Sequence, residues 1–241
     1  MEATVSSSDR APDAEPVIRL RGVEKVYRTG RISYPALRGV DLDVAAGELI
    51  AVVGPSGSGK STILNIITGI DRPTSGGVTV TGRDLVDLSE EELAVWRGRH
   101  VGIVFQFFQL LPTLTALENV MLPLDFARVG TIAERSDRAT GRLEQVGLAD
   151  KIGNFPAELS GGEQQRVAIA RAMVTDPPLI LADEPTGNIH PSMKLEIFDL
   201  FVDCNRKKGT TILFVTHDSV LIDRLRHLDG ARIIDLGSAS A

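Results

Sequence analysis

Residues 49–67 read LIAVVGPSGSGKSTILNII. Five apolar residues typical of a buried strand come first, a glycine-rich loop follows, and the apolar spacing after it indicates a helix that ends near Gly69. The loop matches G-x-x-x-x-G-K-[ST], and a preceding strand with a following helix is the context in which this motif binds phosphate. Its backbone N–H groups converge on phosphate oxygens, and the partial positive charge of the helix N-terminus favours the anion. We therefore predict a nucleotide site made of Gly54, Pro55, Ser56, Gly57, Ser58, Gly59, Lys60, Ser61 and Thr62.

Two side chains of this loop have individual expected roles. Lys60 neutralises the β- and γ-phosphates, and the hydroxyl of Ser61 binds Mg²⁺. The plain alternative is a glycine-rich turn with a snorkelling lysine that binds no ligand.

Further apolar strands alternate with helical patterns along the chain. The clearest strands are Leu49–Val53, Val101–Phe105, Leu179–Ala182 and Thr211–Val215. Short apolar runs of this kind suit strands buried on both faces, so we predict an α/β fold, a P-loop NTPase core with a mostly parallel sheet. Residues Val17–Tyr27 and Leu37–Val44 alternate in polarity and predict an antiparallel N-terminal β piece at one edge.

The middle of the chain is richer in helix signals. Ser89 with Glu92 and Thr115 with Glu118 form capping boxes, and further helical patterns lie around 131–146 and from 162 onward. We predict a helical lobe at about 90–160, inserted into one ATP-binding domain over residues 17–236. Residues 1–16 are predicted to be a disordered lead-in and residues 237–241 a disordered tail.

The composition excludes several classes of protein. Of 241 residues, 43% are hydrophobic and 24% charged, which is ordinary for a globular chain. Its 26 Lys and Arg against 32 Asp and Glu give a net charge of −6, which disfavours a nucleic-acid-binding protein but does not exclude a local basic patch. One cysteine, Cys204, excludes an internal disulfide. No apolar run approaches the ~20 residues of a membrane span, and the first sixteen residues do not form a signal peptide, so we expect an intracellular protein that reaches a membrane only through a partner.

Two carboxylates follow the strand at 179–182. Neighbouring residues on a strand point to opposite faces, so Asp183 and Glu184 are expected to do different work. Asp183 is a candidate Mg²⁺ ligand, often through water, and Glu184 a candidate base for the attacking water. The alternative is a pair of solvated acids before a turn.

Two more polar residues follow buried strands at the edge where open α/β sheets bind ligands. His217 comes directly after Thr211–Val215 and could contact the γ-phosphate or the attacking water; otherwise it is a strand-end histidine beside a capping Asp218. Gln106 follows Val101–Phe105 and could reach the Mg²⁺ shell, or it is an ordinary polar strand terminator.

A second helix start offers a second anion site. Ser160 and Glu163 form a capping box, and Gly161 and Gly162 leave the first backbone amides uncovered. If the two helix starts lie far apart in a monomer, one phosphate cannot bind to both. The two helix starts can meet when two chains face each other head to tail.

Together these motifs make residues 17–236 similar to the ATP-binding subunit of an ABC transporter. Residues 54–61 match its Walker A motif, Gln106 its Q-loop, and residues 159–163 its signature with Glu163 in the last place. Residues 179–183 match its Walker B strand, Glu184 the catalytic glutamate and His217 the switch histidine. Tyr27 matches the aromatic residue that stacks on adenine, although an edge-strand tyrosine beside Tyr34 is the alternative.

The resemblance implies an ATPase whose cofactors are ATP and Mg²⁺ and whose two subunits, most simply a homodimer, close over two ATP molecules. Each ATP would be held by one subunit's loop and by the other subunit's Ser160, Gly161, Gly162 and Glu163. It also implies a separate integral-membrane permease whose coupling helix sits in a groove formed by residues 106–123, and a peripheral location on the cytoplasmic face of the membrane.

A finer resemblance concerns residues 105–120, FQFFQLLPTLTALENV, together with residues 183–188, DEPTGN. Both are similar to the lipoprotein-releasing, macrolide-exporting and cell-division ATPases of bacteria. Two other functions stay open: a soluble ABC-type ATPase acting on DNA or ribosomes, and a regulatory ATPase that gates a partner without transport.

One position departs from the family pattern. After Ile189 the family expects Asp in the D-loop at the dimer interface, and this chain has His190. The change predicts either slower or less coupled hydrolysis, or no effect.

Overall fold

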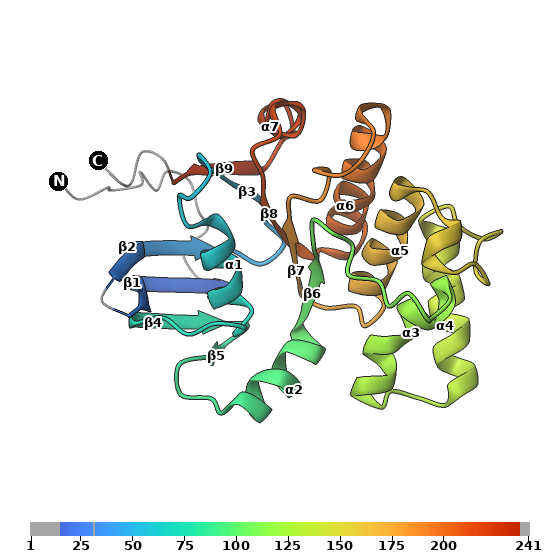
Figure 1. The fold of residues 1–241 in the computed structure, drawn as a ribbon, viewed down its shortest axis with the longest axis horizontal. Coiled ribbons are helices and arrows are strands. Elements are labelled where there is room, and N and C mark those ends of the chain that lie inside the picture. The colour runs from blue at the N-terminus through green and yellow to red at the C-terminus, as the bar shows by residue number, and fades with distance from the viewer. Residues whose placement is uncertain (1–14, 31, 237–241) are drawn as a thin grey trace.

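The computed structural model describes residues 15–30 and 32–236 (Figure 1). The two segments predicted to be disordered, 1–16 and 237–241, lie outside these residues except for Glu15 and Pro16.

A five-stranded parallel sheet forms the centre of the molecule. Its strands lie in the order β6 (Val101–Val104), β7 (Leu179–Asp183), β8 (Thr211–Val215), β3 (Leu49–Val53) and β9 (Ala231–Asp235). All neighbouring pairs are parallel, which confirms the predicted α/β class. β3 and β8 have the predicted bounds, β6 ends one residue earlier and β7 one residue later. Because the strands are parallel, the residues after β3, β6, β7 and β8 meet at one edge of the sheet.

An antiparallel sheet packs beside it. Its order is β2 (Ile32–Val44), β1 (Ile18–Thr29), β4 (Ser75–Val80) and β5 (Arg83–Asp84). β1 pairs with β2 over most of their lengths, with Ile18 opposite Val44 and Thr29 opposite Ile32. This is the predicted antiparallel N-terminal piece.

The helices occupy both sides of the parallel sheet (Figure 1). Their bounds are α1 (Lys60–Ile67), α2 (Glu90–His100), α3 (Ala116–Ala127), α4 (Ile132–Gln145), α5 (Gly161–Met173), α6 (Lys194–Lys208) and α7 (Ser219–Arg226). Two short 3₁₀ helices, η1 (Pro156–Glu158) and η2 (Pro191–Met193), precede α5 and α6. The predicted capping boxes at Ser89, Thr115 and Ser160 are all present.

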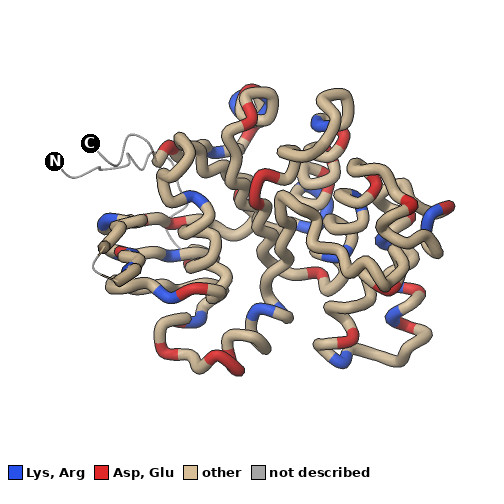
Figure 2. Tube along the Cα trace, viewed as in Figure 1, with Lys and Arg blue, Asp and Glu red and all other residues tan. Residues whose placement is uncertain are grey.

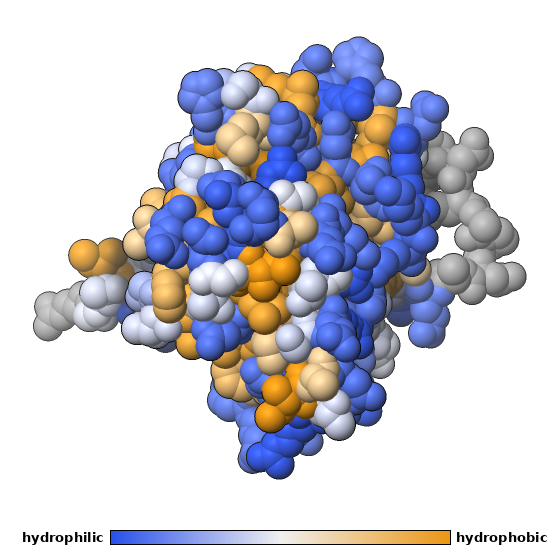
Figure 3. Space-filling view, turned by 90° about the vertical axis from the view of Figure 1, so that its right-hand side faces the viewer, coloured by the Kyte–Doolittle hydropathy of each residue, from blue (hydrophilic) through white to orange (hydrophobic). Residues whose placement is uncertain are grey.

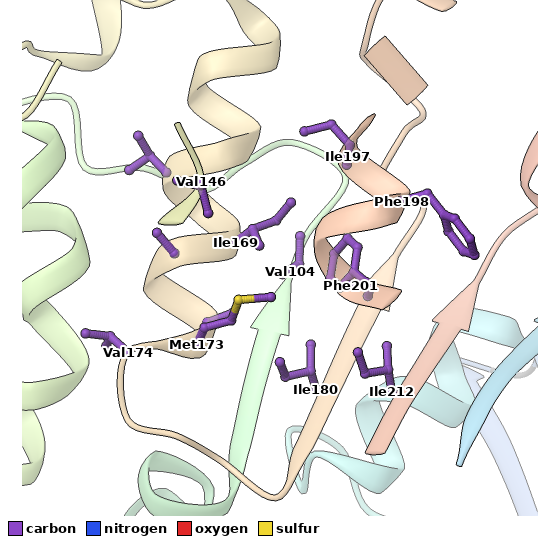
Figure 4. Packing of buried hydrophobic residues seen from close by; sticks show 14 of the residues in the cluster. Val104, Val146, Ile169, Met173, Val174, Ile180, Ile197, Phe198, Phe201 and Ile212 are labelled. Carbon is purple, nitrogen blue, oxygen red and sulfur yellow. The ribbon is translucent and has the colours of Figure 1, made fainter. Parts of the chain in front are cut away.

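Each strand of the parallel sheet contributes to two hydrophobic cores. Ile180 and Ile212 face the core that contains α5 and α6, whereas Leu179 and Leu213 face the core that contains the antiparallel sheet, α1 and α2. This period-two division follows from the alternation of side chains along a strand. Figure 4 shows Val104, Ile180 and Ile212 packed under α5 and α6. In the same core the rings of Phe201 and Phe214 meet edge to face, with centroids 5.1 Å apart.

The region predicted as a helical lobe divides between two places. Leu93 and Trp96 of α2 belong to the core with the antiparallel sheet, and β6 lies in the parallel sheet. α3 and α4 pack with each other and with α5 on the opposite side of the molecule (Figure 1). The boundaries at about 90 and 160 stay a prediction.

In this view, Lys and Arg alternate with Asp and Glu along the described trace (Figure 2). Apolar side chains reach the surface on the side that carries α3 to α5 (Figure 3). Large exposed apolar residues of this region are Phe107, Leu111, Phe126, Val129, Ile132 and Phe155. Within residues 15–30 and 32–236, no helix has both the length and the apolar character needed to cross a bilayer.

Candidate functional site

A pocket of 610 Å³ lies at the edge of the parallel sheet where the strands end. Nearly all residues of the predicted nucleotide and metal site line it: Tyr27, Gly54, Pro55, Ser56, Gly57, Gly59, Lys60, Ser61, Thr62, Gln106, Asp183, Glu184 and His217. Tyr34, Ala36 and Val215 also line it and were not predicted as site residues. Five segments far apart in the sequence therefore converge on one cavity.

The glycine-rich loop runs from the end of β3 into the first turn of α1. Gly59 precedes the helix with φ 91°, and a Cβ at this position would lie 2.6 Å from the carbonyl oxygen of Ala36. Any larger residue is therefore excluded by both conformation and space. No side chain caps the helix start, so its first N–H groups remain available to an anion.

Polar atoms of the loop fit a bound phosphate. The Lys60 ammonium donates to the carbonyl oxygens of Gly54 at 2.8 Å and Pro55 at 2.9 Å, which holds the side chain back along the loop and leaves a third N–H. The Ser58 hydroxyl oxygen is buried and has no hydrogen-bond partner among the described residues. An unsatisfied buried hydroxyl is costly, and a phosphate oxygen in the loop would satisfy it.

Asp183 ends β7 beside Ser61 of α1. Burial raises the pKa of the Asp183 carboxyl, and the nearby charge of Glu184 adds to the rise, while the hydrogen bond from Ser61 and the charge of Lys60 oppose it. A cation at this carboxylate would relieve the cost of keeping it ionised.

The donors available to a metal here are the Ser61 hydroxyl, the Gln106 amide oxygen and the Asp183 carboxylate. These are the hard oxygen ligands that Mg²⁺ prefers. No group of three or more His, Cys, Asp or Glu in residues 15–30 and 32–236 could hold a metal ion. The three oxygen donors that are present fit a cation that completes its shell with phosphate and water, as Mg²⁺ does at nucleotides.

Glu184 occupies a strained and buried position. Its φ is 46°, its backbone N–H donates to the Val215 carbonyl oxygen at 2.8 Å, and the residue is 8% exposed. One carboxylate oxygen lies 2.5 Å from Nδ1 of His217, and the other accepts from the Thr216 hydroxyl at 3.2 Å. Positive φ at a non-glycine residue costs free energy and concentrates at functional sites.

His217 is held by Glu184 at one ring nitrogen and is otherwise open to solvent, with 72% of its side chain exposed. Sequence reasoning placed both residues in the site but did not predict their direct contact. The contact arises because β7 and β8 are adjacent, with Asp183 opposite Val215 in the parallel register.

Asp218 has a structural role beside the site. Its carboxylate caps α7 by accepting from the Val220 N–H at 3.0 Å, and it binds Lys194 at 2.6 Å. Burial alone would raise the pKa of Asp218, but Lys194 and the Thr186 hydroxyl outweigh it and lower that pKa. Asp218 therefore caps α7, as the alternative interpretation of the sequence expected, while His217 lines the pocket.

Tyr27 and Tyr34 both reach the pocket from the antiparallel sheet. The Tyr27 hydroxyl donates to Asp71 at 2.8 Å, and the Lys25 ammonium lies 4.9 Å from its ring centroid. Burial and the Asp71 carboxylate raise the pKa of Tyr27. The Tyr34 hydroxyl donates to the Gly57 carbonyl oxygen at 3.1 Å. Tyr27 and Tyr34, the two tyrosines of the sequence, therefore line the same cavity.

The signature residues Ser160, Gly161, Gly162 and Glu163 do not line this pocket. They form the N-terminus of α5, where the Ser160 hydroxyl and backbone N–H both bind Glu163 at 2.8 Å. These hydrogen bonds, the backbone one above all, lower the pKa of Glu163. Their neighbour is the segment after Glu184, because a Cβ on Gly161 would lie 3.6 Å from the Asn188 carbonyl oxygen.

His190, the departure from the family pattern, stands at the N-cap of η2. Its Nδ1 lies 2.8 Å from the Ser192 hydroxyl and accepts from the Ser192 N–H at 3.4 Å. The imidazole thus performs the local capping that a carboxylate would perform at this position.

Comparison with known proteins gives consistent matches. The family described as "ABC transporter" matches residues 37–187. The lipoprotein-releasing system ATP-binding protein LolD of Anaeromyxobacter dehalogenans is 50% identical over 88% of this chain and 89% of its own length. The macrolide export ATP-binding/permease protein MacB of Syntrophobacter fumaroxidans is 46% identical over 84% of this chain but only 28% of its own length. A dimeric, post-hydrolysis structure of the ATP-binding cassette MJ0796 with ADP and Pi superposes with a TM-score of 0.83 at 43% identity, over 91% of this chain and 95% of the other.

Proposed function

The chain belongs to the ABC transporter family, and on that premise we propose that it dimerises over two ATP molecules and powers a separate membrane permease of the lipoprotein-releasing or macrolide-exporting type. ATP binding and hydrolysis are the activity of this family. The single observation that most supports ATP sites shared between two chains is the convergence of phosphate loop, carboxylates and histidine on one pocket that lacks the signature residues.

Substrate binding is assigned to three parts of the pocket. Tyr27 stacks on adenine, residues 54–62 hold the phosphates, and Lys60 compensates the negative charge of the β- and γ-phosphates. Ser61, Gln106 and Asp183 hold Mg²⁺, which when bound neutralises phosphate charge in the transition state. The raised pKa of Asp183 fits this role because its ionised form needs a cation nearby.

Hydrolysis is assigned to Glu184 and His217. The buried Glu184 carboxylate accepts the proton of the attacking water, and its contacts with Thr216 and His217 keep it oriented. Since Nδ1 of His217 donates to the Glu184 carboxylate, Nε2 is the ring nitrogen left for the γ-phosphate, and it donates to a phosphate oxygen when it also carries a proton. A water placed between these two groups is activated and aligned by the same pair.

Ser160, Gly161, Gly162 and Glu163 act on the ATP of a second chain. They are outside the chain's own pocket, and the related cassette MJ0796 is described as dimeric. The working unit is therefore two copies of this chain with a permease whose coupling helices contact the surface near residues 106–123. The chain then lies peripherally on the cytoplasmic face of the membrane and binds no nucleic acid.

Affinity purification from solubilised membranes of the source cell tests this proposal. A tagged Glu184→Gln chain, loaded with Mg-ATP, is expected to retain an integral-membrane permease identified by mass spectrometry, together with untagged copies of the chain. Lys60→Ala is the matched control, which loses ATP and with it the nucleotide-dependent part of the retention. Retention of ribosomes or DNA in place of a permease would contradict the proposal and favour the soluble ABC-type ATPase.

A regulatory ATPase is distinguished by a second measurement on the same complex. ATP-dependent movement or release of a membrane substrate supports transport. Activation of an enzyme outside the membrane, without such movement, supports the gating alternative.

A further inference from the structure

The loop between β6 and α3 contains two adjacent residues with left-handed backbone. Phe108 has φ 52° and Gln109 has φ 53°, and the Gln109 N–H donates to the Phe107 carbonyl oxygen across a three-residue turn. Neither residue is glycine, and positive φ is unfavourable for a bulky side chain such as phenylalanine. A conformation of this kind persists only where its surroundings hold it.

Arg171 of α5 holds this turn. Its Nη1 donates to the Gln109 carbonyl oxygen at 2.6 Å and its Nη2 to the Phe108 carbonyl oxygen at 2.7 Å. The flat fork of a guanidinium suits two neighbouring acceptors, whereas a lysine ammonium is a point donor. Arg171 forms no ion pair with an acidic side chain of the described residues, so its charge is directed to these two carbonyls.

Arg171 is half-buried, so its guanidinium needs acceptors in the protein to replace lost water. Burial lowers the pKa of its guanidinium, because a half-buried charge loses hydration. The two carbonyl oxygens of the strained turn are what replaces that hydration.

The same loop is fixed to other elements at both ends. The Asn188 amide, from the segment after β7, donates to the Gln106 carbonyl oxygen at 2.8 Å. The buried Asn119 of α3 accepts from the Leu111 N–H at 2.8 Å and donates to the Leu111 carbonyl oxygen at 3.1 Å. Meanwhile Phe107 and Leu111 are 68% and 47% exposed, so the loop shows apolar side chains outward while its backbone is tied inward.

Phe108 connects this loop to the signature end of α5. A Cβ on Gly161 would lie 3.9 Å from the tip of the Phe108 ring. Since side chains of a helix lean toward its N-terminus, Arg171 reaches back along α5 to the same residue from its C-terminal half. The Phe108 ring thus lies beside α5 next to Gly161, and the Phe108 carbonyl oxygen is bound by Arg171.

We propose that Arg171 is a positioning residue that fastens the strained Phe107–Gln109 turn to α5, so that the turn and the Ser160–Gly162 end of α5 move as one body. This inference rests on the proposed function, in which that end of α5 binds the ATP of a second chain. Closure of the dimer on ATP then displaces the exposed turn, and pressure on the turn displaces the ATP-binding end of α5. Without Arg171 the turn relaxes and the two surfaces move independently.

A spin label on the turn tests the proposal in the full chain. Cys204→Ser removes the single native thiol, Phe107→Cys takes the label at an exposed site, and Glu184→Gln prevents hydrolysis. Electron paramagnetic resonance then reports the mobility of the label with and without Mg-ATP. The expected result is a Mg-ATP-dependent spectral shift with Arg171 present, which is lost in Arg171→Met because the label is already mobile. Arg171→Lys, with one point donor, is expected to restore only part of the shift.

Arg135→Met is the matched control. Arg135 binds a different turn, the one between α3 and α4, by donating to the carbonyl oxygens of Val129 and Gly130, both at 2.9 Å. Its removal is expected to leave the shift unchanged. A general loosening of the α3–α4 region would instead reduce the shift in both variants and would overturn the assignment to Arg171.

A second pair of variants covers the case in which Arg171→Met does not fold. Glycine adopts positive φ without penalty, so Gln109→Gly relieves part of the strain, and the double variant Gln109→Gly/Arg171→Met is expected to fold and still lose the shift that Gln109→Gly alone keeps. An equal shift in both, with Mg-ATP bound and dimers formed, would overturn the inference. Failure of the parent chain to bind Mg-ATP or to dimerise would overturn the proposed function, and the inference with it.

Discussion

The starts of α1 and α5 are the two helix ends that we assign to phosphate, but the chain surrounds them very differently. At α1 no side chain caps the helix, and Lys60, Asp183, Glu184 and His217 gather in the same pocket. At α5 the helix start is closed by its own capping box, and the carboxylate of Glu163 sits there. The first end is a nearly complete active site, and the second can contribute only one wall. On the proposed function these are two unequal halves of one site, which two chains complete by exchanging them.

The largest expected effect belongs to the complete end. Glu184→Gln keeps an oxygen that can accept from Thr216 but cannot take a proton from water, so turnover is expected to fall roughly 10²–10⁴-fold. Nucleotide affinity is expected to stay close to that of the unsubstituted chain. Steady-state ATPase rates and equilibrium nucleotide binding measure the two quantities. The control is Glu196→Gln, which alters an exposed carboxylate of α6 that pairs with Arg166 of α5. Full turnover in Glu184→Gln would contradict the assignment of Glu184 as the base.

The next effect concerns Asp183 and pH. Because burial raises the pKa of this carboxyl, it takes up a proton at a higher pH than an ordinary aspartate, whose pKa is about 3.9. Mg²⁺-dependent nucleotide binding is therefore expected to weaken as the pH falls, beginning above that value. Because this pKa is higher in the folded than in the unfolded chain, the folded chain binds the proton more tightly. Protonation of Asp183 therefore raises the free energy of unfolding as the pH falls.

Asp183→Asn is expected to weaken Mg²⁺-supported binding roughly 10–100-fold and to abolish this part of its pH dependence. Titration of a fluorescent ATP analogue at several pH values, with and without Mg²⁺, measures both. A pH profile identical in Asp183→Asn and in the unsubstituted chain would contradict the assignment of the metal to Asp183.

The third effect sharpens the contrast at the weaker end. Ser160→Ala removes an N-cap worth about 1 kcal/mol of stability. It also removes a hydroxyl proposed to face the partner's ATP, and the loss of one such hydrogen bond, about 1 kcal/mol in the transition state, is expected to lower turnover by about fivefold. Binding of ATP to the isolated monomer should not change, since Ser160 does not line its own pocket.

Thr131→Ala is a close control for Ser160→Ala. Thr131 and Glu134 form the same capping box on α4, with Thr131 N–H to Glu134 at 2.7 Å, in a region that does not line the pocket. Equal losses of turnover in the two variants would show that Ser160 acts only through helix stability.

The smallest effect concerns the ion pairs at the C-terminal end of α5, which join it to α4 and α6. The carboxylate of Asp176, at φ 52° after α5, binds Arg142 of α4 and Lys208 of α6, both at 2.5 Å. Burial would raise the pKa of Asp176, but Lys208 and Arg142 outweigh it and lower that pKa. A lowered folded-state pKa means that the stabilisation is present above the unfolded-state pKa and is lost as the pH falls through the folded-state value.

Asp176→Asn is expected to lower the free energy of unfolding at neutral pH by about 1 kcal/mol, since the partly exposed carboxylate is screened by solvent. The difference from the unsubstituted chain should shrink in acid. Urea denaturation at neutral and acidic pH measures it, with Asp203→Asn, from an exposed pair with Lys207, as the control. An equal loss in both variants would contradict a special role for Asp176.

Local signals in the sequence were enough to predict much of the fold. The bounds of β3 and β8 and the capping boxes at Ser89, Thr115 and Ser160 depend on a few adjacent residues, and the structure confirms them. The box at Thr131 and Glu134 carried the same signal and was missed. β9, whose sequence ARIID mixes charged and apolar residues, gave no clear strand pattern and depends on its pairing with β3.

The candidate site divides in the same way. A motif such as residues 54–61 specifies its own backbone, so its place in a pocket could be predicted. The contacts of Glu184 with His217 and of Arg171 with the Phe108 carbonyl join residues that are far apart in sequence. Such contacts depend on strand order and helix packing, which no local pattern encodes.

Self-association under trapped nucleotide tests the central claim most directly. Size-exclusion chromatography with light scattering on Glu184→Gln gives the mass of the species in Mg-ATP and in its absence. We expect about twice the 25.9 kDa chain mass with Mg-ATP, the chain mass without it, and no dimer for Glu184→Gln/Lys60→Ala in either condition. A Glu184→Gln chain that binds Mg-ATP fully and yet stays at the mass of one chain, alone and with its permease, would contradict the account.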